Sequence, residues 1–338
     1  MTETGKRTGW CLTFVIFLLP LLVSVLCIGI GRYHLSPAES LQVLWNTMTG
    51  GEVEATAAAV VINVRLPRIL LSLFVGAGLA ISGASFQSLF SNPLATPDTL
   101  GVATGASFGA VLALLVSNNL VAVQLSALAM GLLALVITST ISRMNGKSSI
   151  IMVVLAGMVV SSLFEALVSL MKYVADPEEE LPTITYWLMG SMSKASLKGI
   201  AFGIPLIAVG IVILFLLRWR LNILSLNEDE ARSLGINVKR LRLAVMAAAT
   251  LVTASSVSMC GQVGWVGLLI PHTARMLYGS DNRRIIPVSI CLGAAFMVII
   301  DTAARAATAA EIPVSILTAI IGAPFFIVLL RKTGGAKL

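Results

Sequence analysis

The chain has 338 residues, of which 57% are hydrophobic and only 12% are charged. A soluble domain carries about 25% charged residues, so this composition excludes a water-soluble globular protein. Apolar runs close to the ~20 residues that cross a bilayer recur from one end to the other. The composition therefore predicts one all-α membrane domain over residues 1–338.

Ten apolar segments are expected to be membrane helices. They lie at residues 10–31, 69–90, 98–117, 120–142, 149–174, 199–218, 241–260, 263–278, 285–306 and 312–331. We interpret the first as a retained helix and not a signal peptide, because it is longer than the usual apolar region of a signal. The eighth contains Pro271 and would span only about 24 Å, so we expect a short or broken helix beside a cavity.

Loop charge predicts how the chain is oriented. With the N-terminus inside, 16 of the 23 Lys and Arg residues lie on the cytoplasmic side and seven lie outside. This bias fits the positive-inside rule and predicts a multi-pass protein of a prokaryotic inner membrane with both termini in the cytoplasm. The net charge of +7 then faces anionic lipid and requires no nucleic acid as a partner.

Motifs that carry enzyme chemistry are missing from the sequence. There is no GxxxxGK[ST] loop, which excludes binding of ATP by a P-loop, and there is no HExxH or nucleophile elbow. His34 and His272 are far apart, and the four cysteines have no CxxC spacing. We therefore predict no catalytic residues, no metal site and no cofactor.

Three arginines are expected at the outer face. Arg65 and Arg68, in the string RLPR, lie three residues apart and share one side of the second helix, and Arg305 lies at the outer end of the ninth. They suit either interfacial snorkelling or a docking surface for carboxylates. Asp301, four residues before Arg305, can form an intrahelical pair that neutralises a carboxylate within the membrane.

Glu165 is a second acidic residue within an apolar segment. A carboxylate in this position is costly, so it is a functional candidate. It can line a transport path or bond to a nearby serine, and the sequence leaves these alternatives open.

The largest cytoplasmic connection, residues 218–242, is predicted to contain a short helix. Asn227 suits the N-cap, and acidic residues starting at Glu228 fill the first turn, where they complement the helix dipole. Gly235 suits the position just past a helix end. We expect a helix from Glu228 to Leu234 along the membrane face, which by composition alone is a capped connector.

Four strings together resemble the FecCD-type permeases, the membrane subunits of ABC importers for iron–siderophore, haem and cobalamin complexes. The strings are RLPR, NPLATPDTLG, NEDEARSLGI and GAPFF, and the resemblance is strongest over residues 60–332. It implies about ten transmembrane helices in a dimer, with two separate ATP-binding subunits that hydrolyse ATP and an extracytoplasmic substrate-binding protein.

The resemblance also implies roles for particular residues. The arginines at 65, 68 and 305 would pair with glutamates of the substrate-binding protein. The helix in residues 218–242 would be the coupling helix that docks on the ATPase, with small side chains on its exposed face. The implied coupling residues are Asn227, Glu228, Ala231, Leu234 and Gly235, and the implied cytoplasmic gate comprises Asn92, Leu94, Ser149 and Ile150.

The sequence thus predicts a non-catalytic permease, a homodimer that imports an iron chelate (a siderophore complex or haem). The alternative is cobalamin import by the same family. A remote alternative is an ion-coupled secondary transporter that uses Glu165 and Asp301, and a membrane enzyme or structural protein is a further one. The sequence does not decide which chelate is carried or whether the second permease of the dimer is an identical copy or a related chain. It also leaves open whether the binding protein is periplasmic or lipid-anchored.

Overall fold

The computed structural model describes residues 3–117, 119–142, 150–225, 228–233 and 235–333. Every regular element among these residues is a helix, as predicted, and each of the ten apolar segments corresponds to one of them. These ten are α1 (Glu3–Gly29), α4 (Leu66–Leu89), α5 (Val102–Val116), α6 (Leu120–Ile141), α7 (Ile150–Val174), α9 (Leu197–Leu216), α11 (Val238–Cys260), α12 (Val266–Tyr278), α13 (Asn282–Ala307) and α14 (Val314–Thr333).

Shorter helices join or extend them. They are α2 (Pro37–Thr49), α3 (Ala55–Ala58), η1 (Ala59–Arg65), η2 (Pro97–Leu100), α8 (Glu180–Leu188), η3 (Arg220–Ser225) and α10 (Glu228–Ser233). The second membrane helix begins earlier than predicted, because α3, η1 and α4 form one helical stretch of 35 residues. The π-helical segment η1 ends at Arg65, two residues before Pro67, which has no backbone N–H to donate, and the change in hydrogen-bond pattern lets the helix continue past this residue.

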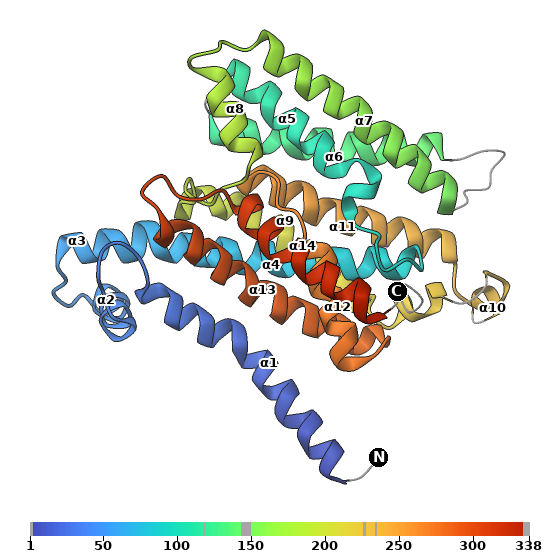
Figure 1. The fold of residues 1–338 in the computed structure, drawn as a ribbon, viewed down its shortest axis with the longest axis horizontal. Helices are drawn as coiled ribbons and strands as arrows, with labels where there is room; N and C mark the ends of the chain where they lie inside the picture. Colours follow the sequence, from blue (N-terminus) through green and yellow to red (C-terminus); the bar gives the residue numbers. More distant parts are fainter. Residues whose placement is uncertain (1–2, 118, 143–149, 226–227, 234, 334–338) are drawn as a thin grey trace.

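Helix α4 is the centre of the bundle. It packs against α13, α11, α9 and α12, while α5, α6 and α7 form a group on one side and α1 lies on the other side of α13 (Figure 1). The apolar stretch that includes α4 is 83% buried, against 28% for α7 and for α9. A helix that is apolar all round is stable when protein surrounds it, so α4 is the internal helix, whereas α7 and α9 expose most of their surface.

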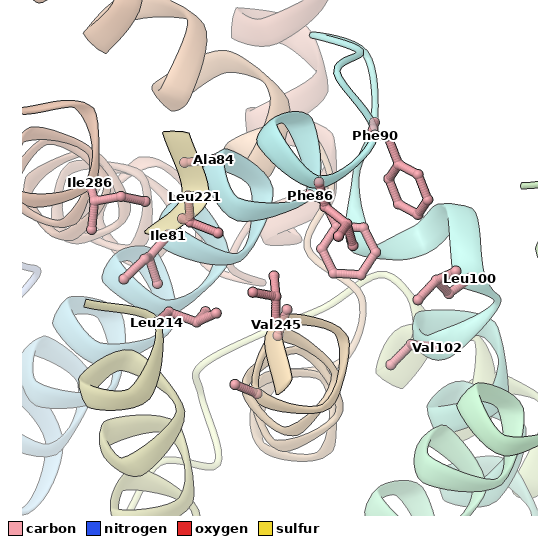
Figure 2. Close-up of a cluster of buried hydrophobic side chains, with 14 of the residues drawn as sticks. Ile81, Ala84, Phe86, Phe90, Leu100, Val102, Leu214, Leu221, Val245 and Ile286 are labelled. Carbon is pink, nitrogen blue, oxygen red and sulfur yellow. The ribbon is translucent and has the colours of Figure 1, made fainter. Parts of the chain in front are cut away.

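One buried cluster joins the helices near the C-terminal end of α4. Figure 2 shows Ile81 and Phe86 of α4 beside Leu214 of α9, Leu221 of η3 and Val245 of α11. All five side chains are fully buried, so the connection after α9 is packed into the same core as the membrane helices. Ala231 of the following helix, α10, belongs to the same cluster.

Small residues let α4 approach its neighbours closely. A Cβ atom added to Gly76 would lie 2.2 Å from the carbonyl oxygen of Gly293 in α13, and one added to Gly83 would lie 1.9 Å from that of Gly267 in α12. The GxxxG pattern in α5 behaves in the same way, since Gly105 and Gly109 face the backbone of α6. These are the close helix contacts that such spacing favours in membranes.

Six helices in the described part of the chain are long and apolar enough to cross a membrane. Helix α12 is shorter, with 13 residues that include Pro271, and it follows a turn in which Trp265 has a φ of 69°. A cavity of about 230 Å³ lies beside its first turn, lined by Asp98, Thr253, Gln262 and Trp265 among others. The expectation of a short eighth helix beside a cavity is confirmed.

The Gly83–Gly267 contact gives a stability prediction. Gly83→Ala should destabilise the protein by about 1–3 kcal/mol, because the added methyl group meets a backbone carbonyl that cannot rotate away. Gly264→Ala is the matched control, since a Cβ at this position meets no atom within 4 Å. Thermal unfolding of the two variants in detergent checks the prediction, and equal melting temperatures would contradict it.

Candidate functional site

Five charged residues gather at one end of the bundle. Arg65 is the last residue of η1, and Arg68 lies in the first turn of α4. Asp301 and Arg305 come from the last part of α13, and Glu311 from the connection that follows α13. We call these five the arginine cluster, and the end of the bundle where they lie the arginine end. The other end, where α10 lies, is the α10 end (Figure 1).

Arg68 links two carboxylates. Its Nη2 atom is 2.7 Å from Oδ1 of Asp301, and its Nε lies 3.2 Å from both carboxylate oxygens. Its Nη1 donates to Oε1 and Oε2 of Glu311 at 2.9 and 3.0 Å. The predicted pair between Asp301 and Arg305 is also present, but it is the looser contact, with 3.9 Å between Oδ2 and Nε. Arg68 is therefore the main partner of Asp301.

Arg65 and Arg305 hold the end of α1. The carbonyl groups of a helix's last turn have no partner within the helix and carry its negative dipole end. Arg65 donates to the carbonyls of Ile28 and Gly29 at 2.7 and 3.1 Å and also to that of Tyr33, and Arg305 donates to that of Cys27 at 2.6 Å. The two guanidinium groups thus act as a C-terminal cap for a helix that has no basic residue in its own last turn.

The three arginines are not exposed in the single chain, contrary to the sequence analysis, and their role in docking stays a prediction. Arg65 and Arg68 are each 2% exposed, and Arg305 is 7% exposed. Their apolar stems are covered by neighbouring helices, and their guanidinium groups bond to carboxylates and carbonyls of the same chain. Snorkelling into the interface does not describe them either, since that would leave the charged groups in water.

Glu311 was missed by the sequence analysis. Its side chain is 31% exposed, which makes it the accessible carboxylate partner of Arg68, and its backbone is in the left-handed region with a φ of 54°. The start of α14 beyond it bonds to the connection between α8 and α9, through Val314 N to the carbonyl of Gly190 at 3.0 Å. The available signal was that Glu311 is the only acidic residue after Asp301 in the sequence.

The predicted short helix is present at the other end as α10, with six residues. It ends in a Schellman motif: Gly235 has a φ of 75°, and the N–H of Ile236 bonds to the carbonyl of Ala231 at 3.3 Å. Gly235 therefore has the predicted helix-ending position. Asn227 and Leu234 lie outside the described residues, and Glu228 begins the helix.

Ala231 does not lie on an exposed face, contrary to the sequence analysis. It is 1% exposed and belongs to the main apolar core, together with Leu224 and Val238. The exposed residues of this segment include Glu230, Ser233 and Gly235. The helix is therefore attached to the bundle through Ala231.

A second attachment joins the segment before α10 to α13. Asn222 donates through Nδ2 to Oδ1 of Asp281 at 2.8 Å, and its Oδ1 accepts from the N–H of Asn282 at 2.9 Å. The backbone N–H of Arg283 donates to the same Asp281 carboxylate, and this bond, followed by that from Asn222, lowers the pKa of Asp281. The α10 segment is thus held by the two hydrogen bonds of Asn222 and by the apolar contact of Ala231.

The predicted gate residues are described only in part. Asn92 is exposed and forms a turn, in which its Oδ1 accepts from the N–H of Leu94 at 2.9 Å, and Leu94 is 46% exposed. Ser149 lies outside the described residues, and Ile150 begins α7. The structure brings the η2 end of the first gate segment against α7, where a Cβ on Gly157 would be 1.9 Å from the carbonyl oxygen of Thr99.

Glu165 lies on an exposed face of α7. Among the described residues its carboxylate has no hydrogen-bond or ion-pair partner, and the bond from Ser169 goes to its backbone carbonyl at 2.9 Å. Of the two intramembrane carboxylates, Glu165 and Asp301, only Asp301 is paired with an arginine among the residues that the structure describes.

The buried Arg68–Asp301 pair predicts strong coupling between the two positions. Arg68→Leu should destabilise the protein by about 3–5 kcal/mol, because it leaves Asp301 buried without its main partner. The double variant Arg68→Leu with Asp301→Leu should recover much of this loss. Thermal unfolding checks this, with the exposed Arg284→Leu as control. A double variant no more stable than the single one would contradict the prediction.

Comparison with known proteins gives one family over almost the whole chain. The model of the FecCD transport family matches residues 18–332. The molybdate import system permease protein MolB of Haemophilus influenzae is 42% identical, with 94% of this chain and 95% of that protein covered. The cobalamin import system permease protein BtuC of Halobacterium salinarum is 41% identical, with 82% and 75% covered.

A probable iron chelatin transport system permease protein of Helicobacter pylori is 35% identical, with 96% of this chain and 99% of that protein covered. Among solved structures, an inward-facing conformation of a transporter of the metal-chelate ABC type superposes with a TM-score of 0.85 at 40% identity. The match covers 94% of this chain and 98% of the other. Sequence and fold agree: the chain belongs to the FecCD transport family, as a permease of an ABC importer.

Proposed function

We propose that this permease imports an iron chelate, either a siderophore complex or haem. Two copies of the chain form the translocation path, two ATP-binding subunits dock at the α10 end, and an extracytoplasmic substrate-binding protein docks at the arginine end. Both termini lie on the cytoplasmic side of a prokaryotic inner membrane. The proposal is supported by the family match over residues 18–332, together with a 35% identical relative named for iron chelatin transport.

The geometry of α10 supports its role as the coupling helix. A subunit that hydrolyses no ATP must receive motion from its partner through a rigid contact. Helix α10 is closed by a Schellman motif, and it is attached to the core through the buried Ala231. A push on its exposed side therefore reaches α11 and the bundle.

Molybdate import is the second candidate, because a relative named for molybdate import is 42% identical over 94% of this chain. Cobalamin import is the third, from a relative that is 41% identical. An ion-coupled transporter stays the remote alternative, and it would have to rely on Glu165, since Asp301 is already paired with Arg68.

Transport by reconstituted vesicles tests the proposal. The permease is assembled in liposomes with its ATPase and its substrate-binding protein, and uptake of a ferric siderophore, haem, cobalamin and molybdate is compared with and without ATP. The proposal expects ATP-dependent uptake of an iron chelate. Uptake that follows an ion gradient without ATP would overturn the importer mechanism, and uptake of molybdate or cobalamin alone would overturn the cargo.

The coupling role predicts the effect of a bulky residue on α10. Ser233→Trp should abolish binding of the ATPase without unfolding the permease, because Ser233 is exposed and its hydroxyl donates to the carbonyl of Glu230 within the same helix. The control is Ser193→Trp, at an exposed serine of the connection between α8 and α9 at the arginine end. Co-purification with the ATPase measures the effect. Equal recovery of the ATPase by both variants would rule out docking at α10.

The docking role requires a carboxylate exchange. Arg65, Arg68 and Arg305 remain the proposed docking arginines, but their burial means that a partner's glutamate must replace Glu311 on Arg68. Glu311→Gln should therefore speed association of the binding protein, whereas Arg68→Ala should slow it. Both effects should shrink at high salt, because the Debye length falls below about 8 Å above 0.15 M.

Association rates of the binding protein with permease in nanodiscs, measured across a salt series, test this exchange. Glu178→Gln is the matched control, because Glu178 is an exposed glutamate with no arginine contact among the described residues. If Glu311→Gln slows association or behaves as the control does, Glu311 does not compete with a docking partner.

A further inference from the structure

The exposed side of α7 carries two lines of different chemistry over its second half. Val159, Leu163 and Leu170 are 64%, 52% and 50% exposed, and their spacing of four and seven residues places them along one line of the helix. Ser162, Glu165 and Ser169 are also exposed, and their spacing of three and four residues places them along a second line, which is apolar only before Ser162, where Ile151 and Met158 continue it. The two lines are about 100° apart around the helix axis.

Glu165 lies deep within this span. It is the sixteenth of the 25 residues of α7, so it is about 5 Å from the midpoint of a helix about 37 Å long. No described residue of the chain pairs with its carboxylate. A charged side chain that faces lipid at this depth costs at least about 2.5 kcal/mol, so the line of Ser162, Glu165 and Ser169 requires a polar environment that the described residues do not supply.

We propose that this polar line faces a water-filled path between two copies of the chain, and that the two Glu165 carboxylates give the path a preference for cationic and neutral metal chelates over oxyanions. The inference rests on the proposed function, because it requires the dimeric path. The apolar line of Val159, Leu163 and Leu170 then faces lipid or the apolar surface of the partner.

Symmetry strengthens the effect of a single residue. In a two-fold dimer each position occurs twice on the path, so every cargo passes two carboxylates. Two like charges in direct contact would repel, which favours an open, hydrated path at this level over tight helix packing. An anion such as molybdate meets repulsion from both copies, whereas a cation is attracted and a neutral chelate is unaffected. Of the two proposed cargoes, a cationic or neutral siderophore complex is therefore favoured over haem, which carries two carboxylates.

Charged thiol reagents test this without knowledge of the cargo. Ser169→Cys places a thiol on the polar line about 6 Å along the helix from Glu165. The full-length protein in lipid vesicles is treated with the cationic trimethylammonioethyl and the anionic sulfonatoethyl methanethiosulfonate. Adding Glu165→Gln should lower the ratio of the cationic to the anionic rate roughly tenfold, as expected for one charge at this distance in water.

Leu170→Cys is the matched control. Leu170 follows Ser169 directly but lies on the apolar line, so its thiol should react slowly with both reagents. The parent chain measures the background from its four native cysteines. Three results would each overturn the inference. They are slow labelling of Ser169→Cys by both reagents, fast labelling of Leu170→Cys, and a ratio of cationic to anionic labelling rates that Glu165→Gln does not change. Failure of ATP-driven uptake would overturn the proposed function instead, because the labelling ratio depends on neither ATP nor cargo.

Discussion

The ion pair between Arg68 and Asp301 is the interaction on which the arginine end depends. It joins the start of α4 to the last part of α13, and the two side chains are only 3% and 2% exposed. Because a buried charge that loses its partner is costly, these helices cannot separate here without a large loss of stability. The pair also fixes its neighbours, since Arg68 holds Glu311 and Asp301 lies beside Arg305, which in turn bonds to the end of α1.

Hydropathy and capping chemistry were enough to predict most of the fold. All ten apolar segments are helices, because an apolar stretch in lipid must satisfy its backbone within itself. Helix α10 was predicted to within one residue, because the acidic first turn and Gly235 are local signals. The central place of α4 follows from its small residues, such as Gly76 and Gly83, although only the structure identifies the helices they contact.

Properties that depend on distant partners could not be predicted. The sequence around Arg65 is typical of an arginine at the membrane interface. The residue is buried because it bonds to carbonyl groups of α1 that lie 36 and 37 residues earlier. The orientation of Ala231 depends on the core formed by α9, η3 and α11, which no local pattern encodes. Glu311 was overlooked because its importance comes from Arg68, 243 residues away. The roles in docking, coupling and gating stay predictions, since they concern partners outside this chain.

The cap on α1 has a consequence for biogenesis. Helix α1 is made first, yet the carbonyl of Cys27 receives its bond from Arg305, which is 278 residues further along the chain. At synthesis rates of about 5–20 residues per second, this partner emerges roughly 15–55 s later. The carbonyls of Ile28 and Gly29 can be capped much earlier, because Arg65 follows them by only 37 and 36 residues. Until α13 is made, however, the carbonyl of Cys27 has to stay in contact with interfacial water. The cap of the first helix is therefore completed only after α13 has been synthesised, and a ribosome that stalls before α13 leaves this carbonyl without its arginine.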